Sequence, residues 1–445
     1  KDVTQVPQVF IPYKEVLDVY HAGLQVPDEV TLMWCDDNYG YIRHFPTAEE
    51  RARKGGNGVY YHISYWGRPH DYLWLGTAHP SLIYQQMTLA YERGIQKMWI
   101  LNVVDIKPSE YQIELFLDMA WNLEAVKQQG VVAHQRQFLE REFGLEVAAQ
   151  LQPVMQEAYR LAYIRKPEFM GNTRTEEKDP KFKVISDLPW SEQEINERLA
   201  AYRQLSDKVE QEWHALPAQK KETYFQLVKY PIQAAAQMNN KLLTAQLARH
   251  GKADWADSDR AYDSIVSLTK TYNTTKWNRM MDFQPRRLLV FNRVERKALS
   301  SGLLEKPQAV YTWNGADCVE GASVICEGLG YEGKAVAVEK KKELTFEFTA
   351  WETDSVEVEV RLLPNHPVEG ERLRFTISLD GSATEAVSYE TKGRSEEWKE
   401  NVLCNQAVRR MILPVARKAS HRLIFTALDE GVVLDQICLY MPRIK

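Results

Sequence analysis

Features typical of membrane, metal-binding and phosphate-binding proteins are missing from this 445-residue chain. No apolar run approaches the roughly 20 residues that a membrane-spanning helix needs. The five cysteines are odd in number and irregularly spaced, which fits neither a disulfide framework nor a Cys-x-x-Cys metal site. The glycine-rich segment 55–58 lacks the Lys-Ser/Thr of a phosphate-binding loop. We therefore expect no membrane span, no metal and no cofactor.

The chain also lacks a surplus of positive charge. Its 56 lysines and arginines are outnumbered by 61 aspartates and glutamates, so the formal net charge is −5. Proteins that bind nucleic acid usually concentrate basic residues, and this balance argues against such a partner. With 44% hydrophobic residues the chain can bury several cores, and its length predicts two or three domains.

Four short apolar runs occupy the first hundred residues. They lie at 8–12, 32–35, 59–64 and 98–104, with a helix predicted at 80–93 between the last two. This alternation predicts parallel βα units. Four such units make half of a (β/α)8 barrel, and a half barrel alone would leave two sheet edges open. We expect residues 1–110 to be the second half of a barrel whose first half precedes them, which agrees with the lack of an initiator Met or signal segment.

Polar and aromatic residues follow each predicted strand. In parallel α/β folds the carboxyl ends of the strands border the ligand site. The candidates are Tyr13, Lys14, Glu15, Asp36, Asp37, Asn38, His62, Ser64, Tyr65, Trp66, Asn102 and Asp105. Acids, amides and aromatics without a dense thiolate or histidine group suit a carbohydrate better than a metal, because amides and carboxylates bond hydroxyls and rings stack on sugar faces.

Glycoside hydrolysis requires a carboxylic acid to protonate the leaving oxygen and a carboxylate to activate water or attack. Glu15, Asp36, Asp37 and Asp105 are candidates. Three of them also have a structural interpretation: Glu15 opens a predicted helix, where the dipole favours an acid, and Asp37 and Asp105 can brace loops. His62 is equally interpretable as a hydrogen-bonded core residue. Cys35 is best interpreted as a small buried hydrophobe.

The remaining chain shows two other periodicities. Apolar residues recur every three or four positions at 111–121, 147–163, 195–216 and 224–247, with a loop at 166–189, which predicts a helical bundle over 111–290. Alternation at 344–348, 356–360 and 373–379 predicts antiparallel strands of an accessory β-sandwich over 300–445. Exposed Trp313 or Trp351 could stack on sugar, although a core position is the stronger expectation.

Three segments together resemble a known family. They read WCDDNYGYIR at 34–43, GNGVYYHISYWG at 56–67 and WILNVVDIKP at 99–108. They are similar to the xylan α-1,2-glucuronidases of glycoside hydrolase family 115, whose order of barrel, helical domain and C-terminal sandwich matches the order predicted above. The resemblance implies inverting removal of glucuronic acid, or its 4-O-methyl ether, from glucuronoxylan or aldouronic acids.

The resemblance also implies residue roles. Glu15 falls on an essential carboxylate and is assigned as the general acid. Asp36 is one candidate for the base, and a carboxylate outside this sequence is the other. The positions matched to uronic acid binding or to shaping its site are Asn38, His62, Tyr65 and Asn102. Arg43 and Arg68 are local candidates for pairing with an anionic substrate, although they are more readily explained as rim residues.

Two other function classes stay open at this point. A non-hydrolytic carbohydrate-binding protein with a related pocket would use the same amides and aromatics, and a helical interaction scaffold would bind no aldouronic acid. The family and a polymeric substrate imply a periplasmic or secreted protein. We expect a homodimer formed through the helical or C-terminal domain.

Overall fold

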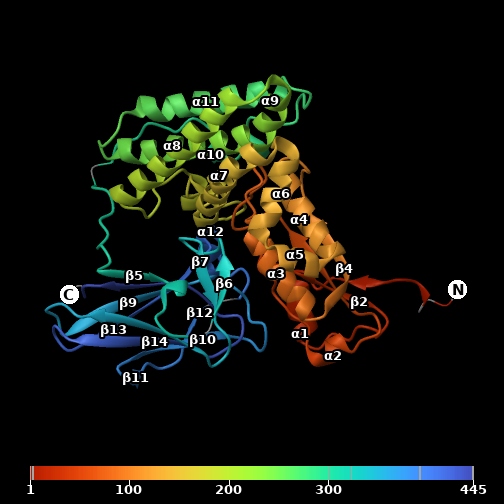
Figure 1. Cartoon of the computed structure of the whole chain (residues 1–445), viewed down its shortest axis with the longest axis vertical. Helices are drawn as coiled ribbons and strands as arrows, with labels where there is room; N and C mark the ends of the chain where they lie inside the picture. Colours follow the sequence, from red (N-terminus) through yellow and green to blue (C-terminus); the bar gives the residue numbers. More distant parts are fainter. Residues whose placement is uncertain (1, 3–4, 300, 322, 390–391, 443–445) are drawn as a thin grey trace.

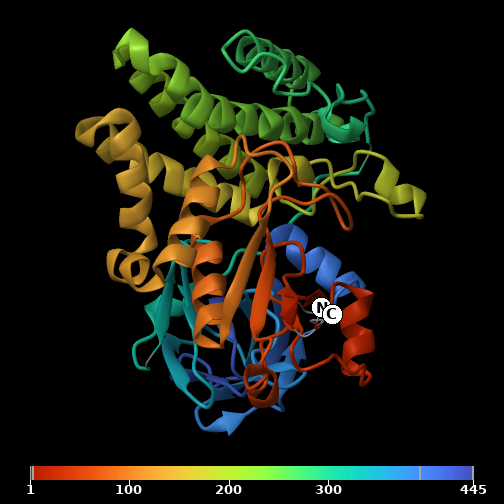
Figure 2. The same cartoon turned by 90° about the vertical axis from the view of Figure 1, so that its right-hand side faces the viewer.

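The computed structural model describes residues 2, 5–299, 301–321, 323–389 and 392–442. The chain runs through three sections, each with one kind of secondary structure (Figure 1). A parallel sheet comes first, a layered group of helices second, and two antiparallel sheets last. Figure 2 shows the helices above both kinds of sheet.

The first section contains four parallel strands in chain order. They are β1 (Val9–Phe10), β2 (Thr31–Cys35), β3 (Asn57–His62) and β4 (Ile95–Asn102). Helices α1 (Glu15–His21), α2 (Ala48–Arg51) and α3 (Pro80–Glu92) lie in the connections. All five residues of β2 are buried, which is typical of an inner parallel strand. Within the described residues β1 pairs only with β2 and β4 only with β3, so both outer edges are open.

Helix α3 shows why the sequence folds locally as predicted. Pro80 occupies its first position, where the missing N–H costs no intrahelical bond, and the His79 side chain accepts from the Ser81 N–H. Gly94 follows its end with φ +90°, a conformation that glycine adopts without strain. Leu82, Ile83, Met87 and Ala90 are buried, and three of them belong to the core that also holds Trp34 and Val59 of the sheet.

The second section is helical. Its elements are α4 (Glu110–Trp121), α5 (Leu123–Gln129), α6 (Val131–Phe143), α7 (Leu145–Ile164), α8 (Glu192–Ala215), α9 (Ala218–Tyr224), α10 (Tyr230–Arg249) and α11 (Trp255–Asn273). The helix predicted over 224–247 is interrupted by a π-helical turn at Phe225–Lys229. The predicted loop at 166–189 contains only two short 3-10 turns. Helix α10 is buried on nearly all sides, so its sequence has a weak polar face.

The third section consists of two antiparallel sheets that share one hydrophobic core. The order is β11-β10-β14-β8 in one sheet, with β12 beside β10, and β13-β9-β15-β7-β6 in the other, with β5 beside β15. Their bounds are β5 Tyr311–Asn314, β6 Val324–Glu327, β7 Lys334–Ala337, β8 Glu343–Thr349, β9 Ser355–Leu362, β10 Leu373–Leu379, β11 Ser382–Ala383, β12 Val387–Tyr389, β13 Ala407–Pro414, β14 Ser420–Ala427 and β15 Val433–Tyr440. Trp313 and Trp351 pack against this core, as favoured from the sequence.

One helix of the third section was not anticipated. Helix α12 (Glu396–Cys404) stands between β12 and β13 and begins at Ser395, whose side chain accepts from the Trp398 N–H. Its Trp398 Nε1 donates to Asp37 after β2, and ion pairs from Arg174 to Glu396 and from Lys399 to Glu177 tie it to the loop of the helical section. Helix α12 therefore contacts both other sections.

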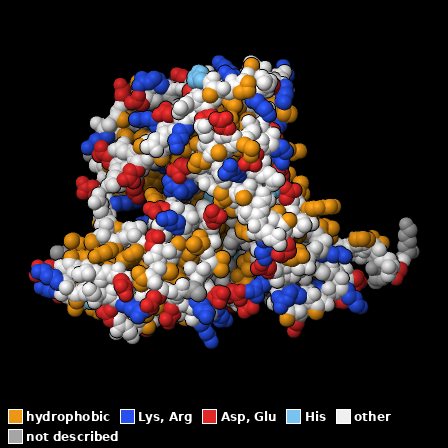
Figure 3. Space-filling model, in the orientation of Figure 1, with side chains coloured by type: hydrophobic (Ala, Val, Ile, Leu, Met, Phe, Trp, Pro, Cys, Tyr) orange, Lys and Arg blue, Asp and Glu red, His pale blue; other side chains and the backbone are white. Residues whose placement is uncertain are grey.

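The surface is mixed in charge, and the cysteines are unpaired. Acidic and basic side chains are interspersed over the face in Figure 3. No helix within the described ranges combines the length and apolarity that crossing a membrane requires. All five cysteines are free, so the structure contains none of the disulfides that the last four could have formed. Cys35 is buried in β2 as expected, and burial raises the pKa of its thiol.

Candidate functional site

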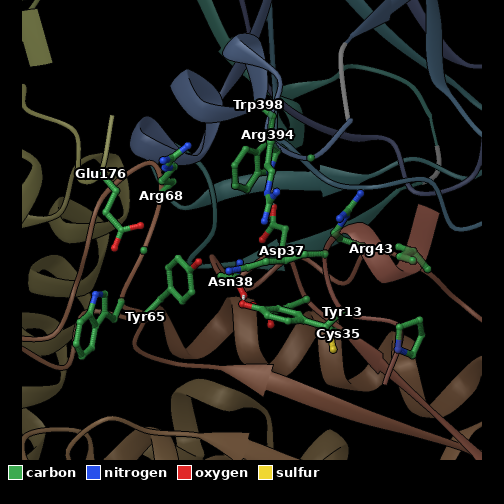
Figure 4. A pocket seen from close by; sticks show the side chains of 17 residues that line it. Tyr13, Cys35, Asp37, Asn38, Arg43, Tyr65, Arg68, Glu176, Arg394 and Trp398 are labelled. Carbon is green, nitrogen blue, oxygen red and sulfur yellow. Dashed lines mark hydrogen bonds between the residues drawn. The ribbon is translucent and has the colours of Figure 1, made fainter. Parts of the chain in front are cut away.

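A cavity of about 340 Å³ lies where the carboxyl end of β2 meets the start of α12 (Figure 4). All three sections of the chain contribute to its wall. The lining residues are Pro12, Tyr13, Lys14, Leu17, Cys35, Asp36, Asp37, Asn38, Arg43, Tyr65, Trp66, Gly67, Arg68, Glu176, Gly393, Arg394 and Trp398. This volume is in the range of small-molecule sites.

Asp36 forms the buried acidic end of this cavity. Its Oδ1 lies 2.6 Å from His62 Nδ1, and its Oδ2 accepts from the Gly40 N–H at 2.9 Å. Burial raises the pKa of Asp36, while His62 and the Gly40 N–H act against that rise. His62 is itself buried and touches the site through Asp36 rather than through the cavity wall.

Asn38 and Tyr13 form a second polar contact at the same strand end. The Tyr13 hydroxyl donates to Asn38 Oδ1 at 2.8 Å, and the Tyr13 ring stacks on His62 with centroids 6.0 Å apart. Asn38 has φ +75°, which asparagine tolerates better than most residues. Burial raises the pKa of the Tyr13 phenol, so this hydroxyl stays a donor at neutral pH. The amide of Asn38 is thereby fixed in orientation at the cavity wall.

Tyr65 lines the cavity and Asn102 does not. The Tyr65 ring meets His62 edge-on at 5.7 Å, and its backbone exchanges hydrogen bonds with Tyr72. Asn102 ends β4, and its Nδ2 donates to the Tyr60 hydroxyl at 2.6 Å. The structure thus brings Asp36, Asn38, His62 and Tyr65 together and leaves Asn102 outside the lining.

Glu15 is the first residue of α1 and is not among the residues that line the cavity, which it meets only through its ion pair with Arg394. Its side chain is 69% exposed, and its Oε2 lies 3.0 Å from Arg394 Nη2. A backbone N–H, followed by the Arg394 guanidinium, lowers the pKa of Glu15. In this arrangement Glu15 is ionised at neutral pH, the opposite of what a general acid needs at the moment of proton transfer.

Asp37 holds the site together. Its Oδ1 accepts from the N–H groups of Tyr39 and Tyr41, and its Oδ2 accepts from Trp398 Nε1 at 2.8 Å and contacts His366 Nε2 at 3.1 Å. The side chain is completely buried. The loop-bracing interpretation of Asp37 agrees with these contacts, which in addition bind the first section to the third.

Four cations face the cavity. Lys14, Arg43 and Arg68 come from the first section and Arg394 from the third, and Figure 4 shows Arg394 and Trp398 opposite Tyr13 and Cys35. A side chain at Gly393 would meet the Arg43 guanidinium at 2.9 Å, so glycine allows this close approach. On the rim, Asp71 Oδ2 holds Arg286, which covers the Trp66 ring at 3.6 Å.

Sequence reasoning missed Arg394, Trp398 and Glu176. No local pattern marks them, because they enter the site only where α12 contacts Asp37 after β2 and where the 174–177 loop contacts residues 69–71. Among the described residues, no group of three or more His, Cys, Asp or Glu side chains is arranged to hold a metal ion.

Comparison with known proteins finds one family that matches both ends of the chain. The profile of glycosyl hydrolase family 115 matches residues 1–169, and the profile of the family 115 C-terminal domain matches residues 322–445. A solved family GH115 4-O-methyl-alpha-glucuronidase, described as having specificity for decorated arabinogalactans, is 67% identical with a TM-score of 0.97. The match covers 99% of this chain and 59% of that protein. No curated protein matches the chain significantly.

Two carbohydrate-binding modules match a smaller part. A family 35 module from an environmental isolate is 11% identical, with a TM-score of 0.24 over 30% of this chain and 93% of the module. The module CBM6cm-2 from Cellvibrio mixtus lichenase 5A, solved with cellotriose, is 13% identical, with a TM-score of 0.24 over 31% of this chain and 100% of the module. At these scores neither supports a conclusion about this chain.

Proposed function

Because the chain belongs to glycoside hydrolase family 115, we propose that its cavity takes part in hydrolytic removal of α-linked glucuronic acid, or 4-O-methylglucuronic acid, from a polysaccharide. The observation that carries the proposal is the set of four cations, Lys14, Arg43, Arg68 and Arg394, around a buried acid and a fixed amide. Guanidinium and ammonium groups bind carboxylates through charge-assisted hydrogen bonds. The amide of Asn38 is suited to a sugar hydroxyl.

We assign Glu15 as the general acid and Asp36 as the base of an inverting reaction. Inversion uses two carboxyl groups roughly 6.5–9.5 Å apart with water between them. A bound uronate would compete for Arg394, and the sugar would cover Glu15. Loss of the cation and burial both raise the pKa of a carboxylic acid, so substrate binding would convert Glu15 to the protonated form that the reaction needs.

Asn38, His62, Tyr65 and Asn102 have separate parts in this proposal. Asn38 and Tyr65 line the cavity and would contact the uronic acid directly. His62 would act through Asp36, to which it is bonded. Asn102 would support the site indirectly. It bonds the Tyr60 hydroxyl, and the Tyr60 ring packs edge-on against His62 with centroids 5.2 Å apart.

Two polymers are candidate substrates. Resemblance to the xylan-active members favours glucuronoxylan or an aldouronic acid. The 67% identical relative is described as specific for decorated arabinogalactans, which makes a galactan carrying the same uronic acid the second candidate. Both polymers present the same charged sugar, so the four cations do not discriminate between them.

The fold, the cellular location and the oligomeric state are proposed from the same family membership. We propose that β1 to β4 form half of a (β/α)8 barrel, since both outer strands have open edges, and that the two C-terminal sheets form a β-sandwich. We propose a periplasmic or secreted location because the substrate is a polymer. A homodimer through the helical or C-terminal section is likewise proposed.

Release of free uronic acid tests the function. Glucuronoxylan and glucuronic acid-decorated arabinogalactan are incubated with the protein in its full natural length, and free (4-O-methyl)glucuronic acid is quantified. Glu15→Gln should lower turnover by about 10²- to 10⁴-fold while substrate affinity is kept, because general acid catalysis contributes about that much. Glu49→Gln is the matched control, since Glu49 is exposed and lies outside the cavity.

The outcomes separate the remaining hypotheses. Release by the parent and by Glu49→Gln but not by Glu15→Gln supports a glucuronidase with Glu15 at its centre. Binding of aldouronic acid without release by any of the three proteins supports the non-hydrolytic carbohydrate-binding alternative. Neither binding nor release would contradict both.

A further inference from the structure

A second cavity lies between the helices and the C-terminal sheets. It has a volume of about 530 Å³ and adjoins a smaller one of about 400 Å³. Five residues line both: Ile164, Trp190, Glu194, Glu197 and Tyr331. The two spaces therefore form one elongated groove along α8, which we call the α8 groove. Figure 3 shows this face of the molecule hollowed between the upper helices and the lower sheets.

The walls of the α8 groove are held in place by side chains. Lys306 Nζ donates to Glu194 at 2.9 Å, and Gln308 Nε2 donates to Gln193 at 2.9 Å, which fastens the linker segment 304–308 to the first turn of α8. On the opposite wall Asp435 accepts from the Tyr331 N–H at 2.9 Å and from Gln406 Nε2 at 2.9 Å. Asp435 is buried, so both contacts are shielded from water. The groove is thus preformed.

The chemistry of the α8 groove differs from that of the first cavity. Two aromatic side chains, Trp190 and Tyr331, stand at the junction of its two parts, and Tyr331 is 36% exposed. The nearby arginines are already engaged: Arg361 bonds Glu359, Gln436 and Tyr440, and Arg410 bonds Glu359. Paired cations leave little positive charge for an anion. Carboxylates, amides and two aromatic rings remain, and these are the groups that bind uncharged sugars. Each ring has a guanidinium near one face: Arg361 lies 5.9 Å from the Tyr331 centroid and Arg198 lies 5.2 Å from the Trp190 centroid.

Helix α12 connects the two sites. Trp398 near its start and Arg394 just before it line the first cavity, while Cys404 at its end, with Asn405 and Gln406, lines the α8 groove. Its nine residues span about 13 Å at 1.5 Å per residue. One polysaccharide chain is long enough to reach both ends of such a helix. A branch point in the first cavity would leave neighbouring sugars near the groove.

We propose that the α8 groove binds an uncharged segment of the polysaccharide main chain. The idea rests on the proposed function, because it takes the branch in the first cavity to be a uronic acid attached to that main chain. Trp190 and Tyr331 form the stacking surfaces, and Glu197 with Gln308 bonds sugar hydroxyls. The site raises affinity for the polymer relative to a short branched fragment and plays no part in bond cleavage.

Unbranched neutral oligosaccharides test the proposal directly. Linear six-sugar xylo-oligosaccharide and galacto-oligosaccharide, both free of uronic acid, are titrated calorimetrically into the protein in its full natural length. Tyr331→Ala should weaken binding of one of them by about tenfold, as expected for the loss of one aromatic stacking contact. Tyr331→Phe keeps the ring and should bind nearly as the parent does. Trp121→Ala is the control, because Trp121 is 91% exposed and lies outside the groove.

Each result has a definite meaning. Arg394→Ala should leave neutral oligosaccharide binding unchanged; if it abolishes binding while Tyr331→Ala does not, the sugar occupies the first cavity and the proposal is wrong. Absence of binding to both oligosaccharides also overturns it. If Tyr331-dependent binding occurs but the full-length protein releases no uronic acid, the groove survives and the proposed hydrolytic function fails. A melting temperature of Tyr331→Ala equal to that of the parent excludes loss of folding as the cause of weaker binding. Trp190→Phe is measured in the same way as a second groove variant.

Discussion

His62 Nδ1 lies 2.6 Å from Oδ1 of Asp36, and both side chains are buried at the end of neighbouring parallel strands. His62 thus acts against the burial that raises the pKa of Asp36. The contact favours the ionised form of Asp36, which the proposed base must be. It also gives the imidazole a role that does not require contact with substrate.

Replacing His62 with Ala should raise the pKa of Asp36 further, because the ring nitrogen that bonds its carboxylate and acts against the rise is lost. If Asp36 is the base, the Asp36 pKa that the kcat/KM profile contains moves to higher pH, and turnover at neutral pH falls by about 10²-fold. The unpaired carboxyl should also lower the free energy of unfolding by about 1–3 kcal/mol. His62→Gln, which restores a donor, should recover much of both losses. A kcat/KM profile of His62→Ala with both limbs at the same pH as in the parent would exclude Asp36 as the base.

Replacing Arg394 with Ala should raise the pKa of Glu15, since the guanidinium is one of the groups that lower it. Because kcat/KM reports the free enzyme, the Glu15 pKa that the kcat/KM profile contains should move to higher pH. KM for the uronate should rise as well, by about tenfold, because a charge-assisted contact is lost. Arg417→Ala, which breaks an exposed pair with Asp354 outside the cavity, is the control. Equal kinetics for both variants would contradict the proposed role of Arg394.

Replacing Trp398 with Phe removes the indole donor to Asp37 while keeping most of the aromatic volume. The buried Asp37 oxygen would keep only His366 as its partner from the third section. We expect the free energy of unfolding to fall by about 1–3 kcal/mol, measured by urea denaturation. Trp351→Phe, a partly buried indole in the same section but outside the site, should cost less. Similar losses for the two variants would show that the Asp37 contact adds no stability.

The contribution of Glu50 to the free energy of unfolding should depend on pH. Although burial acts to raise it, hydrogen bonds from His44, the Thr47 N–H and Tyr20 lower the pKa of Glu50 to about 2. Since this lies below the ordinary value of 4.5, the stabilisation is present above pH 4.5 and is lost as the pH falls through about 2. Glu50→Gln should cost about 1–3 kcal/mol at pH 7, and the difference from the parent should shrink below pH 4.5.

Glu49→Gln provides the comparison for that measurement. Glu49 is in the same turn of α2 but is exposed. Its replacement should change neither stability nor pH dependence, because a solvated surface charge contributes little. A constant difference between Glu50→Gln and the parent from pH 7 to pH 3 would show that Glu50 does not titrate as expected.

Local pattern was sufficient to predict the elements that carry the site. Proline at position 80 and glycine at position 94 marked the ends of α3 within one residue. The apolar run that stops at Asp36 predicted β2, and its polar end does line a cavity. These predictions succeeded because burial of a parallel strand and capping of a helix depend on residues close in the sequence.

Pattern was insufficient wherever distant segments meet. Asn102 stands at a strand end as Asn38 does, yet only Asn38 reaches the cavity, because β4 lies two strands away from β2. The π-helical turn that divides the helix predicted at 224–247 left no periodic signal. Helix α12 was hidden among alternating strands.

The sequence by itself determined the parallel order of strand and helix, the acids and amides at the strand ends, and membership of a family through three motifs. Only the tertiary structure decided that Arg394 pairs with Glu15 across 379 residues of chain, that Asp37 is a brace, and that a groove opens beside α8. The reason is physical: hydrophobic periodicity reports which face of an element is buried, but not what covers it. Charge pairs across sections depend on how those buried faces pack.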